Sequence, residues 1–437
     1  MVKIIKEIFG QEKGLFFFHL GIFFLLSAPS LGLIFLFISL IISILQNKQS
    51  YFKNNWNYPF LISGIIMLFI VFVRTFIFKI NISGWNNYLN LIGLSNWIPF
   101  IICFYFFQPY LKNLDLRKKV IYAYLSGSIP LFISGFGQKF FNWYGPIGIF
   151  NNFIIWFQKP LFLEHEPMDG LFSNPNYAGA WLLLLLPMCI ACIKEKRINI
   201  SKKIFLLIFL AVIIFSIVLT QSRNAFIGSL ISIPFIIEGL ILKFILLFIL
   251  FLIILFLISI IPFSPDPLIY VSNKLLPEII KQTFKIESLE IMNIPRVQIW
   301  LESLQLIFKE PILGWGAASF PIIFRLNNGG DWYGHTHNLI LEQAVSYGII
   351  PTSIMFITIV IILQKSFNKI YSKDYRLKNY IFDKAWWAAM FTMFLAHMVD
   401  IPYFDSRISI TFWILLAGLV SIMSEESIPT SKKYKVK

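Results

Sequence analysis

Two arginines and two histidines in polar turns are the side chains best suited to chemistry in this sequence. Arg223 lies in a short turn between two apolar runs, and Arg296 begins a helical pattern within a long polar insertion. His335 and His337 end that insertion at the edge of the next apolar run. A guanidinium can donate two hydrogen bonds to one phosphate, and neutral histidine is a competent general base near pH 7. These residues predict a catalytic site that binds phosphate and removes a proton.

Each of these residues also has a simpler structural explanation. Arg223 could extend to the membrane interface as a snorkelling side chain, and Arg296 could lie on a solvated helix face. Asp400 follows another apolar run, where an ionisable group is costly and suggests function, yet it could merely pair with Arg407. A single histidine is usually structural, but two at one edge beside two candidate phosphate-binding arginines favour a functional site.

Other polar residues near the same edges are predicted to contact substrate. The sequence Asn-Pro-Asn at 174–176 favours a turn and a helix start, so a purely capping role remains open there. The predicted substrate-binding residues are Asn174, Asn176, Trp300, His335, Asn338, Glu342 and Asp400.

A metal site is the alternative interpretation of the two histidines. His335-x-His337 would need further ligands for zinc, and the acidic stretch at 164–169 could supply them in principle. We expect no metal here and no other cofactor. The sequence contains neither a nucleotide-binding glycine-lysine loop nor a dinucleotide-binding glycine fingerprint.

The composition predicts that these residues are carried by membrane-spanning helices. Hydrophobic residues make up 57% of the 437 residues and charged residues only 14%, whereas soluble domains carry roughly 25% charged residues. A spanning helix needs about 20 apolar residues, so we predict an all-α polytopic membrane protein with about twelve such helices. The predicted spans are 14–28, 30–46, 59–79, 95–111, 120–137, 176–193, 203–220, 224–240, 242–262, 338–364, 384–401 and 406–423. The first two form one apolar stretch, divided at Ser27–Ser30 because it contains Pro29 and is too long for a single pass.

The distribution of positive charge predicts the orientation in the membrane. About two thirds of the 37 Lys and Arg residues fall in alternate loops and at the two termini, as the positive-inside rule requires of cytoplasmic segments. This clustering between apolar runs argues against nucleic acid as a partner despite the net charge of +15. Both termini are therefore expected in the cytoplasm, with long extracytoplasmic regions at 138–175 and 263–337. The predicted helix from Arg296 to Lys309, stopped by Pro311 and Gly314, lies in the second region.

Taken in order, four stretches resemble the O-antigen ligase and O-antigen polymerase superfamily. The resemblance covers roughly residues 170–420, whereas the N-terminal half matches in hydropathy alone. The four stretches are Ser173-Asn174-Pro175-Asn176, Ser222-Arg223, Arg296 and Trp300 followed by Glu310-Pro311-Ile312-Leu313-Gly314-Trp315-Gly316, and His337-Asn338 followed by Leu341-Glu342 and Gly348. The glycine that commonly follows Gly348 is missing, and Pro351 stands nearby.

The resemblance implies a glycosyltransferase of the cytoplasmic (inner) membrane whose active site faces outward. The implied donor is a glycan on polyprenyl diphosphate, and the implied acceptor is lipid A core or another glycan. His337 would act as base, with Arg223 and Arg296 stabilising the leaving diphosphate. The implied division is into N-terminal helices (1–170), a ligase-like domain (171–423) and a cytoplasmic tail (424–437). A polymerase joining lipid-linked repeats, a bicarbonate-type transporter and a non-catalytic membrane scaffold remain alternatives.

Overall fold

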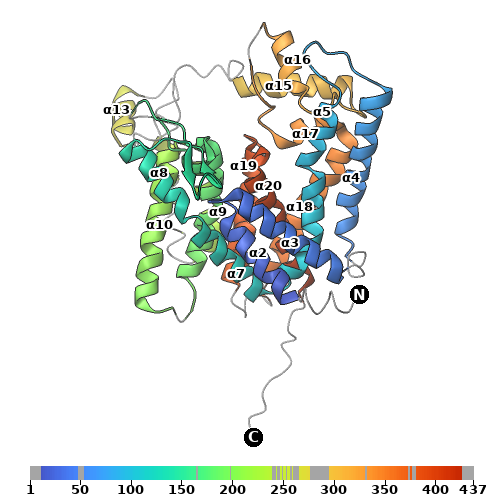
Figure 1. Ribbon diagram of the computed structural model, residues 1–437. Coiled ribbons are helices and arrows are strands. Elements are labelled where there is room, and N and C mark those ends of the chain that lie inside the picture. Colours follow the sequence, from blue (N-terminus) through green and yellow to red (C-terminus); the bar gives the residue numbers. More distant parts are fainter. Residues whose placement is uncertain are drawn as a thin grey trace.

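The computed structural model shows a bundle of helices capped at one end by shorter helices (Figure 1). It describes residues 11–47, 54–163, 166–196, 198–238, 265–275, 295–329, 332–372 and 380–425, together with Tyr375 and nine residues scattered between 243 and 258. The predicted all-α class is confirmed, because helices account for nearly all the regular structure. The exception is an antiparallel hairpin of two short strands, β1 (Ile147–Ile149) and β2 (Ile154–Trp156).

Within the residues that the structure describes, eight helical segments are long and apolar enough to cross a membrane. The number predicted from the sequence was about twelve, and the structure does not confirm that number. The segment 242–262 lies largely outside the described residues, while α2 (Gln11–Phe24), α11 (Arg223–Ile236) and α19 (Ile381–Ala396) are shorter than the length criterion. The eight segments are Pro29–Gln46, Asn57–Ile77, Leu89–Leu111, Leu114–Phe141, Pro175–Ile193, Ile200–Thr220, Ile349–Ile370 and Ser406–Ser424.

Several of these segments are built from more than one helix. Asn57–Ile77 joins α4 (Asn57–Phe72) to the π-turn η2 (Val73–Ile77), and Leu114–Phe141 joins α7 (Leu114–Gly127) to α8 (Ile129–Phe141) next to Pro130. Leu89–Leu111 consists of α5 (Leu89–Gly93), η3 (Leu94–Asn96), α6 (Ile98–Phe107) and η4 (Gln108–Leu111). The remaining long helices are α3 (Pro29–Asn47), α9 (Pro175–Ile193), α10 (Ile200–Thr220), α18 (Ile349–Ile370) and α20 (Ser406–Ser424).

The N-terminal apolar stretch folds back on itself, as predicted. Helix α2 ends at Phe24 and α3 begins at Pro29, so the break falls where the sequence places Pro29. The two helices pack side by side (Figure 1). As described, α2 has 14 residues; at 1.5 Å per residue it is about 21 Å long, less than the roughly 30 Å of a bilayer core.

Helix α9 lies at the centre of the bundle and contacts α10, α11 and α19. Its start is capped by Asn174, whose side-chain oxygen accepts hydrogen bonds from the next backbone N–H groups, and Pro175 occupies the first turn. From Ala178 to Cys192 every side chain is buried. Because other helices surround this segment of α9, its side chains can be apolar on every face of the helix.

The segment predicted as one helix over 338–364 is broken at Gly348, which corrects that prediction. Helix α17 (Leu339–Tyr347) ends there and α18 begins at Ile349. Gly348 has φ +80°, and a side chain at this position would collide with the Ile312 carbonyl oxygen. The Ile349 N–H donates to the Pro311 carbonyl. A loop far away in the sequence therefore forces the bend, which a hydropathy pattern cannot reveal.

Short helices cover the end of the bundle that carries the long polar insertion (Figure 1). They are α13 (Asp266–Leu275), α15 (Pro295–Lys309) and α16 (Phe320–Asn327). Two one-turn helices, η5 (Gly170–Phe172) and η8 (Pro402–Phe404), precede α9 and α20. The predicted helix over Arg296–Lys309 is confirmed as α15. Its apolar face packs with α16 and α17 around buried Ile299, Phe320 and Val345.

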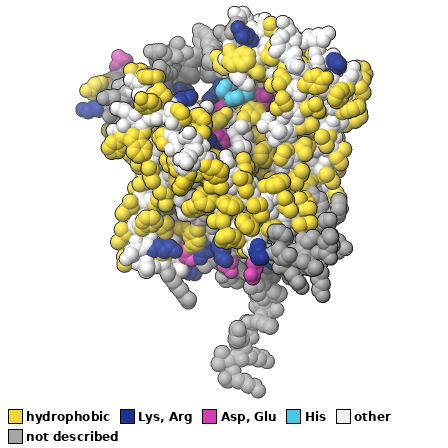
Figure 2. Space-filling model, in the orientation of Figure 1, with side chains coloured by type: hydrophobic (Ala, Val, Ile, Leu, Met, Phe, Trp, Pro, Cys, Tyr) yellow, Lys and Arg dark blue, Asp and Glu magenta, His cyan; other side chains and the backbone are white. Residues whose placement is uncertain are grey.

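Charged side chains gather at the opposite end of the bundle (Figure 2). There Lys118 pairs with Glu195, and the fully buried Arg117 pairs with Asp383 at 2.8 Å. The larger of the two buried clusters takes residues from α2 through α20. The helices of both halves of the chain therefore share one apolar core.

Candidate active site

A strained turn just before α17 carries the two histidines. His337 has φ +53°, a left-handed conformation that costs a residue other than glycine about 1–3 kcal/mol. Surrounding hydrogen bonds hold the turn in place: the Glu342 carboxylate accepts the Thr336 N–H at 2.9 Å, and Thr336 Oγ1 donates to the Asn338 carbonyl at 2.8 Å. Strain that is held in this way is common at functional sites, and here it fixes the direction of the His337 side chain.

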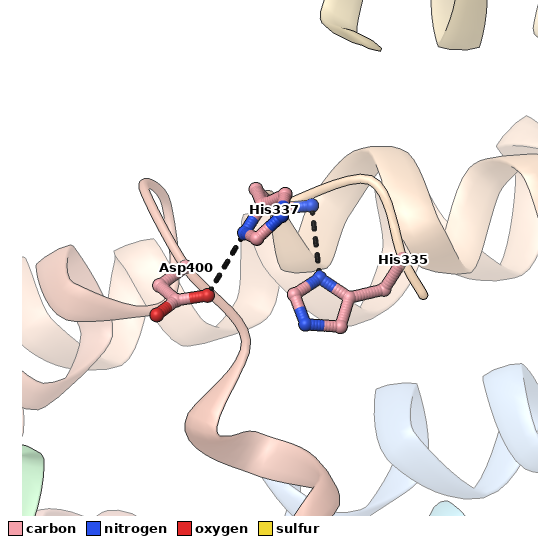
Figure 3. Close-up of side chains that lie close together, drawn as sticks. All are labelled: His335, His337 and Asp400. Atoms are coloured by element: carbon pink, nitrogen blue, oxygen red, sulfur yellow. Dashed lines mark hydrogen bonds and ion pairs between the residues drawn. The ribbon is translucent and has the colours of Figure 1, made fainter. Parts of the chain in front are cut away.

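His337 is paired with Asp400, which follows α19. Its Nδ1 lies 3.0 Å from Asp400 Oδ1 (Figure 3). Burial pushes the pKa of Asp400 upward, but the hydrogen bond and charge of His337 outweigh it and hold that pKa below its ordinary value. An ionised carboxylate can only accept hydrogen bonds. Nδ1 must therefore carry the proton and donate it, which leaves a lone pair on Nε2.

His335 supports the same turn with its ring. The His337 N–H donates to His335 Nδ1 at 3.2 Å, and the two rings lie 4.3 Å apart (Figure 3). Burial, together with the neighbouring His337, lowers the pKa of His335 to about 4. The ring is then neutral at pH 7 and its Nδ1 is free to accept the backbone N–H. This arrangement makes His335 a support for the conformation of His337.

His337, Arg223 and Arg296 line one cavity of 820 Å³, as their placement at one membrane edge predicted. Figure 2 shows histidine in a hollow of the surface on this face. Neither arginine forms an ion pair with any residue that the structure describes. The lining residues that the structure describes carry the two arginines and include no Asp or Glu, which favours the binding of anions.

Apolar side chains also line this cavity. They include Ile227 and Ile231 from α11, and Leu395, Ala396 and Val399 from α19 and the residues after it. The polar side chains Asn176, Gln221 and Asn224 line the same cavity beside the arginines. The cavity therefore suits an amphiphile with an anionic head and an apolar chain.

Close packing of two helices positions Arg223. Arg223 is the first residue of α11, and Ser222 caps that helix by accepting the Ala225 N–H. Gly179 on α9 faces this turn, where a Cβ would lie 2.8 Å from the Cβ atoms of both Ser222 and Ala225. The absence of a side chain at Gly179 lets α9 and α11 approach. Arg223 thereby lies at the same cavity as Asn176 near the start of α9.

Arg296 is placed by the first turn of α15. Pro295 occupies the first helical position, where its missing N–H costs nothing. Ile299, one turn later, is fully buried and lines the cavity beside Arg296. Trp315 Nε1 donates to the Leu306 carbonyl at 2.8 Å and ties the far half of α15 to the loop before α16.

Comparison with known proteins agrees with these features. Residues 206–357 match the model of a family described as O-antigen ligase. The chain is O-antigen ligase-like. It is 22% identical over 345 residues to the ComP-specific O-oligosaccharyltransferase of Acinetobacter baylyi. That alignment covers 72% of this chain, and it spans about 59% of the length of the relative.

The ligase-like segment contains Arg223, Arg296 and His337, whereas Asp400 lies beyond its end. The sequence identified Asp400 as a candidate but suggested a pairing with Arg407. The structure shows a different arrangement, because Arg407 forms its ion pair with Asp405 and also donates to the Leu171 carbonyl. Asp400 is left to hold His337.

Several predicted substrate-binding residues have structural roles in this ligase-like site. Asn174 caps α9, and Asn338 caps α17 while donating to the Met398 carbonyl at 2.9 Å. Glu342 is buried and holds the histidine turn. Trp300 packs against the cluster around Ile299 and does not line the cavity. Of the predicted substrate contacts, Asn176 lines it.

Some cavity residues were not singled out from the sequence. Gln221 and Asn224 flank Arg223 in the same turn, and Asn224 Nδ2 donates to the Ala396 carbonyl at 2.9 Å. Their position in a polar turn could have indicated them. Thr392 lies within the apolar helix α19, and its side chain already donates to the Ala388 carbonyl. Nothing in the sequence pattern marks Thr392.

The acidic stretch at 164–169 is the part of the sequence that could supply further zinc ligands to His335 and His337. Glu164 and His165 lie outside the described residues. Asp169 is buried, and its carboxylate accepts a hydrogen bond from Gln138 at 2.7 Å. The acidic residue beside the two histidines is instead Asp400.

Proposed function

We propose that this protein transfers a glycan from a polyprenyl diphosphate carrier to an acceptor hydroxyl at the outer face of the inner membrane. The observation that carries the proposal is one cavity lined by Arg223, Arg296 and His337 together with several apolar side chains. The two guanidinium groups, which form no ion pair within the described part of the chain, fit the diphosphate, and the apolar lining fits the polyprenyl chain. The ligase-like segment contains all three polar residues.

The geometry supports direct displacement with His337 as general base. The acceptor hydroxyl gives its proton to His337 Nε2 while its oxygen bonds to the anomeric carbon. The bond from that carbon to the phosphate oxygen breaks, and the electron pair leaves with the diphosphate. Arg223 and Arg296 stabilise the charge that develops there, and Asp400 stabilises the protonated imidazole. One displacement inverts the anomeric carbon, and the chemistry requires no metal.

A second cavity of 250 Å³ borders the same turn at Gly334. Its lining combines the aromatic rings of Trp97 and Phe404 with the amide of Asn96 and the hydroxyl-bearing Ser346. Rings beside hydrogen-bonding groups suit a sugar. Since the arginine cavity is assigned to the donor, we place the acceptor glycan at this second cavity.

Lipid A core is the proposed acceptor, as in an O-antigen ligase. Another lipid-linked repeat is the second candidate, which would make the protein a polymerase, and the name of the Acinetobacter relative adds a protein acceptor. A transporter is less favoured because the polar residues gather at one end of the bundle rather than along a path through its middle.

The test uses purified protein reconstituted with a lipid-linked glycan and each acceptor in turn. We expect product with one acceptor class, undiminished by EDTA. His337→Ala should lower turnover by about a hundredfold or more while the protein stays folded, the usual scale for loss of a general base. No transfer to any acceptor, or wild-type turnover in His337→Ala, would overturn the proposal. His19→Ala, which removes a histidine of α2 remote in sequence from the site, is the matched control.

A further inference from the structure

His335, His337 and Asp400 form a compact group of potential metal ligands. One ligand atom from each lies within 4.8 Å of the other two. Figure 3 shows both rings and the carboxylate converging from the turn before α17 and the segment after α19. Among the residues that the structure describes, this is the one such group of three.

We propose that this group binds a zinc-type divalent transition-metal ion and that the bound ion inhibits glycan transfer. The inhibitory part rests on the proposed function, whereas the binding part does not. The proposed transfer mechanism needs no such ion, so the site would be an inhibitory metal site.

The ligand set and spacing fit such an ion. Two imidazoles and one carboxylate are a common zinc ligand set that leaves the fourth position for water. Zinc bonds of about 2.0–2.2 Å in a tetrahedron place ligand atoms roughly 3.4 Å apart. His337 Nδ1 and Asp400 Oδ1, at 3.0 Å, are already close to that separation. Two nitrogen ligands disfavour magnesium and calcium, which prefer oxygen.

The charges around the group decide which residue is indispensable. Arg223 and Arg296 line the adjoining cavity and repel a cation. Asp400 supplies the opposing negative charge, and it is 4% exposed, so water screens it little. Loss of that carboxylate should therefore abolish binding even where both imidazoles remain.

The position of one proton explains why metal binding would inhibit. In the active state, His337 Nδ1 donates its proton to Asp400 and Nε2 has the free lone pair. A metal ion takes the Nδ1 lone pair and the carboxylate, so the proton of the neutral ring moves to Nε2 through solvent. Nε2 then carries N–H and cannot accept the proton of the acceptor hydroxyl. His335 contributes the lone pair that otherwise accepts the His337 backbone N–H.

The binding experiment uses Co²⁺ as a spectroscopic probe with the full-length protein in detergent. We expect visible absorption bands that saturate at one ion per chain and disappear when Zn²⁺ is added. His335→Ala and Asp400→Asn should each lose the bands, and His19→Ala should keep them. Thermal unfolding of each variant checks that it is folded. Absence of saturable binding, or bands that persist in both site variants, would overturn the site.

Inhibition is measured as the ratio of transfer rates with and without Zn²⁺ within each variant. We expect at least a tenfold loss in the wild type that EDTA reverses, and a ratio near one in His335→Ala whatever its basal rate. Binding of Co²⁺ without inhibition by Zn²⁺ would overturn the inhibitory role. A requirement for metal in transfer would overturn it as well. If no acceptor supports transfer, the proposed function fails while the Co²⁺ spectra still decide whether the site exists.

Discussion

The imidazole of His337 and the carboxylate of Asp400 form a hydrogen bond although the two residues are 63 positions apart. The first ends the polar insertion and the second follows α19. Their distance of 3.0 Å, with Asp400 buried, fixes which ring nitrogen of His337 carries the proton. The candidate site thus contains a proposed base with its own orienting group, in a cavity that two guanidinium groups also line.

Asp400→Asn should lower turnover more than it raises the KM for the donor. The amide is similar in shape but has no charge to stabilise the imidazolium, and it can stabilise the wrong tautomer of His337. We expect at least about a tenfold loss of kcat, the lower part of the range for impaired acid–base catalysis. Steady-state transfer assays measure this change. Asp405→Asn, which alters the carboxylate that pairs with Arg407, is the control, and equal rates in both variants would contradict an orienting role.

Arg223→Lys and Arg296→Lys should each weaken catalysis although charge is kept. An ammonium lacks the planar fork that binds two phosphate oxygens at once. A hydrogen bond to a charged group is worth about 1.5–3 kcal/mol, which corresponds to roughly ten- to hundredfold in kcat/KM for the donor. Arg325→Lys changes an exposed arginine of α16 that does not line the cavity, and it should behave like wild type. A similar loss in all three variants would show that the effect is not specific to the cavity and would contradict the proposed phosphate contacts.

The sequence predicted the convergence of Arg223, Arg296 and His337 because each lies in a polar turn or insertion expected on the same side of the membrane, and all three line one cavity. The alternation of apolar and polar segments predicts how deep in the membrane each residue lies. That information is enough to predict which residues share one membrane surface. The same argument correctly gave the helical class and the helix over Arg296–Lys309.

Contacts between distant segments could not be predicted in this way. The pairing of Asp400 with His337 rather than Arg407 depends on where α19 ends relative to α17. The bend at Gly348 depends on a loop at Ile312 that packs against it. Asn338 and Glu342 are polar residues in the right place, yet their side chains hold the turn through hydrogen bonds that spacing alone does not reveal.

The orientation of the bundle can be tested by labelling single cysteines. The native Cys189 and Cys192 are buried and Cys103 is half-buried, so a cysteine-free background should fold after small apolar replacements. Lys203→Cys should react with a membrane-impermeant maleimide only after the membrane is opened. Leu326→Cys, exposed on α16 at the site end, should react in intact cells. Reversed labelling would contradict the predicted orientation and the outward-facing site.

The end of the bundle opposite the site contains a buried ion pair whose loss should strongly destabilise the protein. Arg117 donates to both oxygens of Asp383, at 2.8 and 3.0 Å, and the two side chains are 0% and 1% exposed. Arg117→Met leaves Asp383 buried with Tyr375 as its remaining side-chain donor among the described residues, and it also removes the ion pair of Arg117 with Glu425. Breaking a buried pair typically costs 3–5 kcal/mol, because the remaining charge has lost its partner.

The matched control is Lys118→Met, one position along the same helix. Lys118 pairs with Glu195 where both side chains are partly exposed, at 24% and 17%. A partly hydrated pair is worth about 0–1 kcal/mol, so this variant should melt close to wild type in detergent. The double variant Arg117→Met/Asp383→Leu should recover part of the stability lost in Arg117→Met, since no buried charge is then left unpaired. Equal melting temperatures for Arg117→Met and Lys118→Met would show that burial does not decide the strength of these pairs.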